Sequence, residues 1–323
     1  MKMKYVEFVE PKKLLIREED FSEEIGEEEI AGRTLYTMIS AGTEINGFYL
    51  DVFNWGYPGR CGYTAVFEVE KKGSKVQGFE IGDRVFCMGR HQSYQRVNYK
   101  EAVKIPEKVS SEAALFIRMA GVSMATLSKT HIKSGEKLMV TGLGPVGLMA
   151  MFAYSNLGYE VIGVDPDENR RQTAQSKGFL VFEKAPLEDA KYAKQIALAL
   201  ECSGNETAVL DCCNMVRVRG EVSIVGVPWK QYTDLSAFKV LNSVFYNYVN
   251  LYSGWEMDLP VSNSWCIHES MYHNYELVLQ MIAAGKIDMS GLYVVKSYLE
   301  AQQAYDDIYN KVEKKVATIL SWN

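Results

Sequence analysis

The stretch KLMVTGLGPVGLMAMFAYSNLGYEVIGVD, residues 137–165, decides the fold of this 323-residue chain. A short apolar run precedes three glycines, Gly142, Gly144 and Gly147, which follow the spacing G-x-G-x-x-G. An uncharged helical segment comes next, and a second apolar run ends at Asp165. This order of strand, tight glycine turn, helix and strand is typical of a βαβ unit that binds a dinucleotide.

The glycine turn and Asp165 also predict which dinucleotide binds. Glycines let the backbone turn tightly and approach a pyrophosphate, which the free N–H groups of the next helix attract. Asp165 stands about 20 residues after the first glycine, where a carboxylate accepts both ribose hydroxyls and repels a 2′-phosphate. The sequence therefore predicts NAD. Arg170 and Arg171 leave open how strict this preference is, although both also fit a solvated helix face.

Composition argues against several other functions. The net charge of −6, with no run of Lys or Arg, makes nucleic acid an unexpected partner. The N-terminal MKMKYVEFVEPKK lacks the apolar core of a secretory signal, and six cysteines without a C-x-x-C pair indicate a reduced, cytoplasmic protein. Residues 138–159 are uncharged and long enough to span a bilayer, but their clustered glycines favour a strand, a turn and a buried helix. No membrane partner is expected.

The rest of the chain divides around the glycine turn. Residues 1 to about 115 alternate short β-branched and aromatic segments with turn signals, which predicts a β-rich domain. Up to about residue 230, apolar strands then alternate with helices, two of them charged, and this predicts a parallel sheet covered on both faces. The remainder returns to helix, strand, helix and strand. We expect two domains, one formed by residues 1–120 and 261–323 and the other by residues 121–260.

Several motifs share this order of parts with one known family. They are GTE (42–44), GYTAVFEV (62–69), GDRV (82–85), GLGPVG (142–147), VDPDENRR from 164 and ECSGNETAVL from 201. On these motifs the chain resembles the medium-chain dehydrogenase/reductase family over nearly its whole length. The resemblance implies an α/β protein with a GroES-like β-rich catalytic domain and a Rossmann nucleotide-binding domain. More narrowly, SAGTE and GDRVFCMGRHQSY resemble a zinc-lacking subgroup with bacteriochlorophyllide dehydrogenase-like enzymes, next to the sorbitol and polyol dehydrogenases.

The resemblance also locates the zinc ligands of the metal-dependent members. Their cysteine, their histidine and their third ligand fall on Ala41, Tyr63 and Ile117 in this chain. Alanine and isoleucine have no donor atoms, and the four-cysteine structural zinc loop is missing as well. The segment CIHESMYH, 266–273, places its histidines five residues apart instead of the four that would put both on one helix face. No metal is therefore expected.

Five side chains are candidates for the chemistry that zinc performs in the relatives. By the resemblance, Thr43 matches a hydroxyl that relays the substrate proton, and Tyr63 stands where a metal ligand stood. His91 is a candidate because histidine commonly performs acid–base work near neutral pH, and Arg118 could hold a substrate anion or a developing alkoxide. Glu44 matches the family acid and is expected to organise the site. Each has a structural alternative: a backbone hydrogen bond for Thr43, core packing for Tyr63, a structural role for His91 and an ion pair for Arg118.

The expected cofactor site combines the glycine turn, the end of the next strand and the ends of two later strands. Its residues are Gly142, Leu143, Gly144, Pro145, Val146, Gly147, Asp165, Pro166, Arg170, Cys202, Ser203, Gly204, Val225, Gly226 and Val227.

The sequence thus predicts a zinc-independent, NAD-dependent oxidoreductase acting on an alcohol or carbonyl between the domains. The substrate is a small molecule, either a sugar or polyol or a larger hydroxyalkyl compound. The alternative is a non-catalytic NAD(H)-binding redox sensor or scaffold with a degenerate metal site. The uncharged, aromatic-rich segment VFYNYVNLYSGW, 244–255, would be an odd exposed edge. In relatives the last strand of the nucleotide domain pairs across a dimer axis, so we expect a homodimer through this edge.

Overall fold

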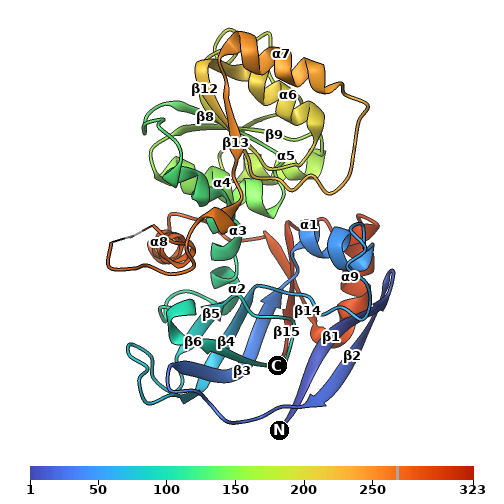
Figure 1. Ribbon diagram of the computed structural model, residues 1–323, viewed down its shortest axis with the longest axis vertical. Coiled ribbons are helices and arrows are strands. Elements are labelled where there is room, and N and C mark those ends of the chain that lie inside the picture. The colour runs from blue at the N-terminus through green and yellow to red at the C-terminus, as the bar shows by residue number, and fades with distance from the viewer. Residues whose placement is uncertain (267–268) are drawn as a thin grey trace.

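The structure is a computed structural model that describes residues 1–266 and 269–323. Two domains lie one above the other in Figure 1, and both chain termini lie in the lower domain. The upper domain is built from the middle of the chain, and the lower domain contains its blue beginning and much of its red end. The predicted α/β class is confirmed.

The upper domain contains a six-stranded sheet in the order β10-β9-β8-β11-β12-β13, with all neighbouring strands parallel. Leu138 of β8 packs in the same core cluster as α4, whereas Met139 packs with Cys212 of α6, so helices cover both faces of the sheet. The strands are β8 (Lys137–Thr141), β9 (Glu160–Val164), β10 (Leu180–Phe182), β11 (Ile196–Glu201), β12 (Val216–Ile224) and β13 (Asn250–Ser253). The helices are α4 (Pro145–Asn156), α5 (Glu168–Ser176), α6 (Glu206–Met215) and α7 (Ala237–Asn247).

The lower domain is β-rich. Its main sheet has the order β14-β15-β3-β4-β5-β7, with β6 also paired to β3, and β1 and β2 form a separate hairpin. The C-terminal β15 pairs antiparallel with β3, so the end of the chain completes a sheet that its beginning started. The strands are β1 (Lys2–Glu10), β2 (Lys13–Asp20), β3 (Glu29–Met38), β4 (Ala65–Lys72), β5 (Arg84–Cys87), β6 (Tyr94–Asn98), β7 (Val103–Lys104), β14 (Tyr293–Ser297) and β15 (Ala317–Ser321). The helices are α1 (Ala41–Glu44), which a π-helical turn (Ile45–Tyr49) continues, α2 (Ser111–Ala114) and α9 (Ala301–Tyr309).

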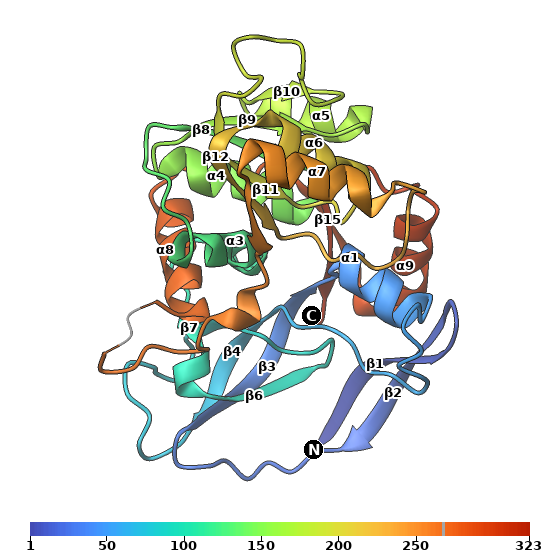
Figure 2. The same cartoon turned by 45° about the horizontal axis from the view of Figure 1, so that its top comes forward.

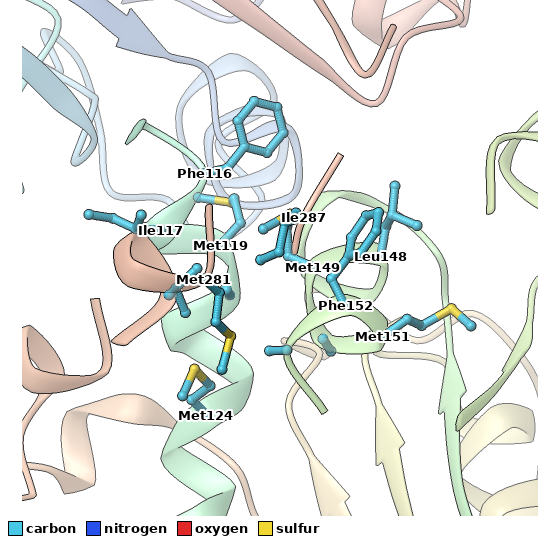
Figure 3. Close-up of a cluster of buried hydrophobic side chains, with 14 of the residues drawn as sticks. Phe116, Ile117, Met119, Met124, Leu148, Met149, Met151, Phe152, Met281 and Ile287 are labelled. Atoms are coloured by element: carbon cyan, nitrogen blue, oxygen red, sulfur yellow. The ribbon is translucent and has the colours of Figure 1, made fainter. Parts of the chain in front are cut away.

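One continuous core joins the two domains through α3 (Ile117–Met124) and α8 (Met271–Ala283). The cluster includes Phe86 of the lower sheet, Ile117 of α3 and Leu148 of α4. Figure 3 shows methionine, leucine, isoleucine and phenylalanine side chains gathered around α3 and α4. Because apolar packing runs without a break across the junction, the relative position of the domains is fixed by the same burial that stabilises each of them.

Two sequence predictions of secondary structure were wrong. The second charged helix, expected between β10 and β11, is absent: residues 183–195 form bends and turns. A single turn closes where the carbonyl of Asp189 accepts from the N–H groups of Tyr192 and Ala193, and it does not continue into a helix. The first part of the expected 244–255 edge belongs to α7, where apolar residues recur at helical spacing. Only Asn250–Ser253 of that segment forms the edge strand β13.

The uncharged stretch 138–159 forms β8, the glycine turn and α4, as expected. Within residues 1–266 and 269–323, no helix has the length and apolar character that crossing a membrane requires.

Candidate functional site

A cavity of about 270 Å³ lies between the glycine turn and the lower domain. One wall consists of Leu143, Gly144 and Pro145 at the start of α4, and the opposite wall consists of Ile39 and Ala41 after β3 together with the segment before β15. The glycine turn leaves no room for side chains, since a Cβ at Gly147 would lie 1.8 Å from the carbonyl oxygen of Gly142. Gly142 itself has a φ of +80°, which favours glycine. The predicted spacing of glycines is therefore what lets α4 begin at this wall.

Asp165 supports the glycine turn from behind. One carboxylate oxygen accepts from the N–H of Leu143 at 2.6 Å and the other from the N–H of Asp167 at 2.8 Å, and the side chain is buried. The guanidinium of Arg170 lies 3.4 Å from the same carboxylate, and Asp165, Pro166 and Arg170 all line the cavity. Asp165 thus places a negative charge at one end of the cavity, and Arg170 places a positive charge beside it.

The loops after β11 and β12 meet at the same edge of the sheet. The backbone N–H groups of Val225 and Gly226 donate to the carbonyl of Glu201, and the N–H of Ser203 donates to the Glu201 carboxylate at 2.7 Å. Burial raises the pKa of Glu201, and its hydrogen bonds to Ser203 and Gly204 oppose the rise. Both loops carry predicted cofactor residues, and Glu201, which fixes the two loops together, was not among the predicted ones. Val146 lies in the first turn of α4. Neither Val146 nor any of the predicted residues of these two loops lines the cavity.

Three hydroxyl groups meet where β3 runs into α1. The hydroxyl of Tyr63 donates to Oγ1 of Thr43 at 3.1 Å, and the hydroxyl of Ser40 is hydrogen-bonded to that of Tyr63. Burial raises the pKa of Tyr63, and the positive charge of Arg118 opposes the rise. Ala41, between Ser40 and Thr43 in the chain, lines the cofactor cavity. The structure therefore brings the candidates Thr43 and Tyr63 together and adds Ser40, which the sequence analysis did not select.

His91 lies behind this group of hydroxyls and not among them. It is 1% exposed, and its two ring nitrogens contact Oγ1 of Thr37 at 2.7 Å and the carboxylate of Glu44 at 2.9 Å. Glu44 also accepts from the N–H of Ser40 at 2.9 Å and from the hydroxyl of Tyr305. Glu44 thus holds the turn that carries Ser40, and His91 holds Glu44.

Glu44, Cys61 and His91 are the one group of three metal-binding side chains found in the described part of the chain. The 2.9 Å between His91 and Glu44 is a hydrogen-bond length, whereas two ligands of a tetrahedral zinc lie about 3.3 Å apart at bonds of about 2.0 Å. Burial also raises the pKa of Cys61 well above its usual value, so the thiol keeps its proton, and its sulfur is 3.2 Å from the Tyr305 hydroxyl. In this arrangement Glu44 is hydrogen-bonded to both His91 and Tyr305, and Tyr305 contacts Cys61.

Arg118 is buried and forms a two-pronged ion pair with Glu256. The guanidinium carbon lies 4.9 Å from the ring centre of Tyr63 and 5.8 Å from that of Tyr275. Its Nε has no hydrogen-bond partner among the described residues. Of the two roles considered for Arg118, the contacts match the structural ion pair. Its partner Glu256 could not be found from the sequence, because the two residues are 138 positions apart.

This fold and cleft have known counterparts. Residues 145–263 match the family described as zinc-binding dehydrogenase. This match lies in the nucleotide-binding part of the chain and, together with the dehydrogenase relatives below, agrees with the resemblance to the medium-chain dehydrogenase/reductase family that the motifs indicated. Two of the positions that the resemblance assigned to zinc ligands are Ala41 and Ile117.

Two curated relatives are identical to this chain at about a quarter of the aligned positions. L-threonine 3-dehydrogenase of Vibrio parahaemolyticus is 25% identical over 274 residues, which cover 71% of this chain and 78% of that protein. Sorbitol dehydrogenase of Bacillus subtilis is 26% identical over 206 residues, or 52% of this chain and 58% of that one. Among solved structures, galactitol-1-phosphate dehydrogenase from Escherichia coli has a TM-score of 0.83 at 17% identity, covering 98% of this chain and 99% of that one.

Proposed function

We propose that this protein transfers hydride between NAD(H) and an alcohol or carbonyl compound without a catalytic zinc. The observation that carries the proposal is the hydrogen-bonded group Ser40, Tyr63 and Thr43, whose chain neighbour Ala41 lines the cofactor cavity. When an alcohol loses hydride its hydroxyl must also lose a proton, and a carbonyl must gain one. Hydroxyl groups in a chain can pass that proton.

The direction of the hydrogen bonds supports this role. Tyr63 donates to Thr43, so the hydroxyl hydrogen of Thr43 remains for a substrate oxygen. Ser40 then donates to Tyr63, which completes a chain of three O–H groups. In the reduction direction, Thr43 gives its proton to the forming alkoxide and regains one from Tyr63. Tyr63 regains a proton from Ser40, and Ser40 takes one from water. The Tyr63 phenol is protonated at neutral pH, as such a donor requires.

We further propose that NAD(H) is the preferred cofactor. The buried Asp165 carboxylate at the end of the cavity repels a 2′-phosphate, and Arg170 at 3.4 Å reduces that repulsion. Replacing Asp165 with asparagine removes the charge but keeps an oxygen for one of the backbone N–H groups. We expect the ratio of kcat/KM for NADH over NADPH to fall by roughly tenfold, equivalent to about 1.4 kcal/mol. An unchanged ratio in steady-state assays would show that Asp165 does not select the cofactor.

The edge of the upper sheet supports a homodimer. β13 is an edge strand, and the neighbouring α7 exposes Phe238, Leu241 and Phe245 by 69%, 66% and 73%. Single exposed apolar residues are ordinary, but a row of them beside an open strand edge is typical of an interface. We propose that two copies pair through β13 and α7.

Light scattering tests the dimer. At micromolar concentration we expect the mass of two 36.5 kDa chains for the wild type and of one chain for Phe245→Asp. Leu299→Asp, which changes a 66% exposed leucine of the lower domain, is the matched control and should remain dimeric. A monomeric wild type contradicts the proposal.

A spectrophotometric screen tests the proposed activity. Alcohols and ketones are offered with NAD⁺ or NADH while absorbance is followed, and the zinc content of the same sample is measured. The proposal expects turnover with zinc far below one equivalent per chain. NADH binding without turnover of any substrate favours the redox-sensor alternative, and one zinc per chain that is needed for activity refutes the hydroxyl chain.

The six cysteines, all unpaired in the structure, are consistent with the reduced, cytoplasmic setting that we expect.

A further inference from the structure

Three aromatic rings meet between the two domains. Phe53 and Trp55 come from the loop that follows α1 and its π-helical turn, and Trp229 comes from the loop that follows β12. Trp229 lies 5.3 Å from Phe53 and 6.1 Å from Trp55, measured between ring centres. Phe53 is 48% exposed and Trp55 is 52% exposed. We call these three residues the aromatic cluster. About half of the surface of Phe53 and of Trp55 therefore faces solvent at the junction of the domains. Exposed aromatic surface in such a place is typical of a ligand-binding site.

The aromatic cluster stands beside the proposed reaction centre. The ring of Trp55 lies over Gly47, where a Cβ would come within 2.3 Å of it. Gly47 is one helical turn beyond Thr43, a rise of about 6 Å along the helix axis. On the other side, Trp229 follows Val227, the last predicted cofactor residue after β12, and its N–H donates to the Val227 carbonyl at 2.9 Å. Figure 1 shows α1 on the side of the lower domain that faces the upper one.

Local contacts hold the aromatic cluster in position. The carboxylate of Asp51 accepts from the backbone N–H of Trp55 at 2.6 Å and of Gly56 at 3.2 Å. The ring of Phe48 meets that of Trp55 edge-on at 5.2 Å. The carboxylate of Asp51 is therefore occupied by hydrogen bonds to the backbone of its own loop. The cluster itself presents apolar ring faces on a fixed frame.

We propose that the aromatic cluster binds a flat, apolar ring of the substrate and so selects aryl or other planar cyclic alcohols and ketones over open-chain polyols. This inference rests on the proposed function and names its substrate class. Ring faces stack on a planar ring with little loss of conformational freedom, whereas a polyol placed against them leaves its hydroxyl groups without partners. Trp55 and Trp229 are the residues that set this preference, one from each domain.

Binding of three ketones to the complex with NAD⁺ tests the proposal, because such a complex cannot turn over. Calorimetry compares acetophenone, cyclohexyl methyl ketone and butan-2-one. For the wild type we expect acetophenone to bind roughly tenfold tighter than each of the other two. Trp55→Leu and Trp229→Leu should lose most of this ratio, while Trp229→Phe, which keeps a ring, should retain it. NAD⁺ affinity should change less than about twofold in all of them.

Trp265→Leu is the matched control, because it removes a tryptophan that is 93% exposed outside the aromatic cluster. Its acetophenone preference should equal that of the wild type. Equal binding of the three ketones by the wild type, or a preference that survives both leucine variants, overturns the inference and leaves the proposed function standing. Failure of NAD⁺ itself to bind overturns both.

Discussion

Replacing Thr43 with valine is expected to lower kcat by about 100-fold or more, the usual contribution of a positioned acid or base. Valine has nearly the shape of threonine but cannot take the hydrogen bond from Tyr63 or give a proton to a substrate oxygen. The dissociation constant of NADH should be unchanged, because Thr43 is not a residue of the cofactor cavity. Steady-state kinetics and a separate NADH titration measure the two quantities.

Two further variants interpret the result. Thr43→Ser keeps the hydroxyl and should keep most of the activity. Tyr63→Phe breaks the chain between Ser40 and Thr43 and should lose activity to a similar degree as Thr43→Val. Full activity of Thr43→Val would mean that the proton leaves by another route.

Replacing Arg118 with methionine is expected to destabilise the protein by about 3–5 kcal/mol, because it leaves the Glu256 carboxylate buried without its counter-charge. The pair also ties α3 to the segment after β13, the two places where the chain passes between the domains. The shift in the midpoint of urea unfolding, with circular dichroism as the signal, measures the effect.

A double variant separates the charge from the packing. Arg118→Met combined with Glu256→Met removes both charges and should recover much of the lost stability. Arg33→Met is the control, since its ion pair with Glu68 at 3.4 Å is exposed and should contribute less than about 1 kcal/mol. If Arg118→Met and Arg33→Met unfold at the same urea concentration, the buried pair has no structural role.

The nucleotide domain was predictable because its signals are local. The glycine spacing, the apolar strands and Asp165 lie within one short stretch, and the structure of each depends on residues close to it in the sequence. The same holds for Thr43 and Tyr63, whose positions follow from family motifs. Ser40 was within reach of the same analysis, because it adjoins Ala41 in the quoted SAGTE motif.

Other parts of the site depend on contacts between distant segments. Tyr305 reaches Glu44 across 261 positions, and Trp322 reaches Thr37 across 285, because the end of the chain returns to the first sheet. His91 illustrates the consequence: histidine is a common acid–base residue, but Glu44 and Thr37 occupy both ring nitrogens of His91. No local sequence pattern predicts that a carboxylate distant in the sequence will form a hydrogen bond with a buried histidine.

The most direct test of the account is a calorimetric titration of the wild-type protein with NADH. The glycine turn, the buried Asp165 and the cavity between the domains predict one binding site per chain with a dissociation constant in the micromolar range. A titration without heat of binding for either NADH or NADPH would contradict the assignment of that cavity, and with it the role of the hydroxyl groups beside it.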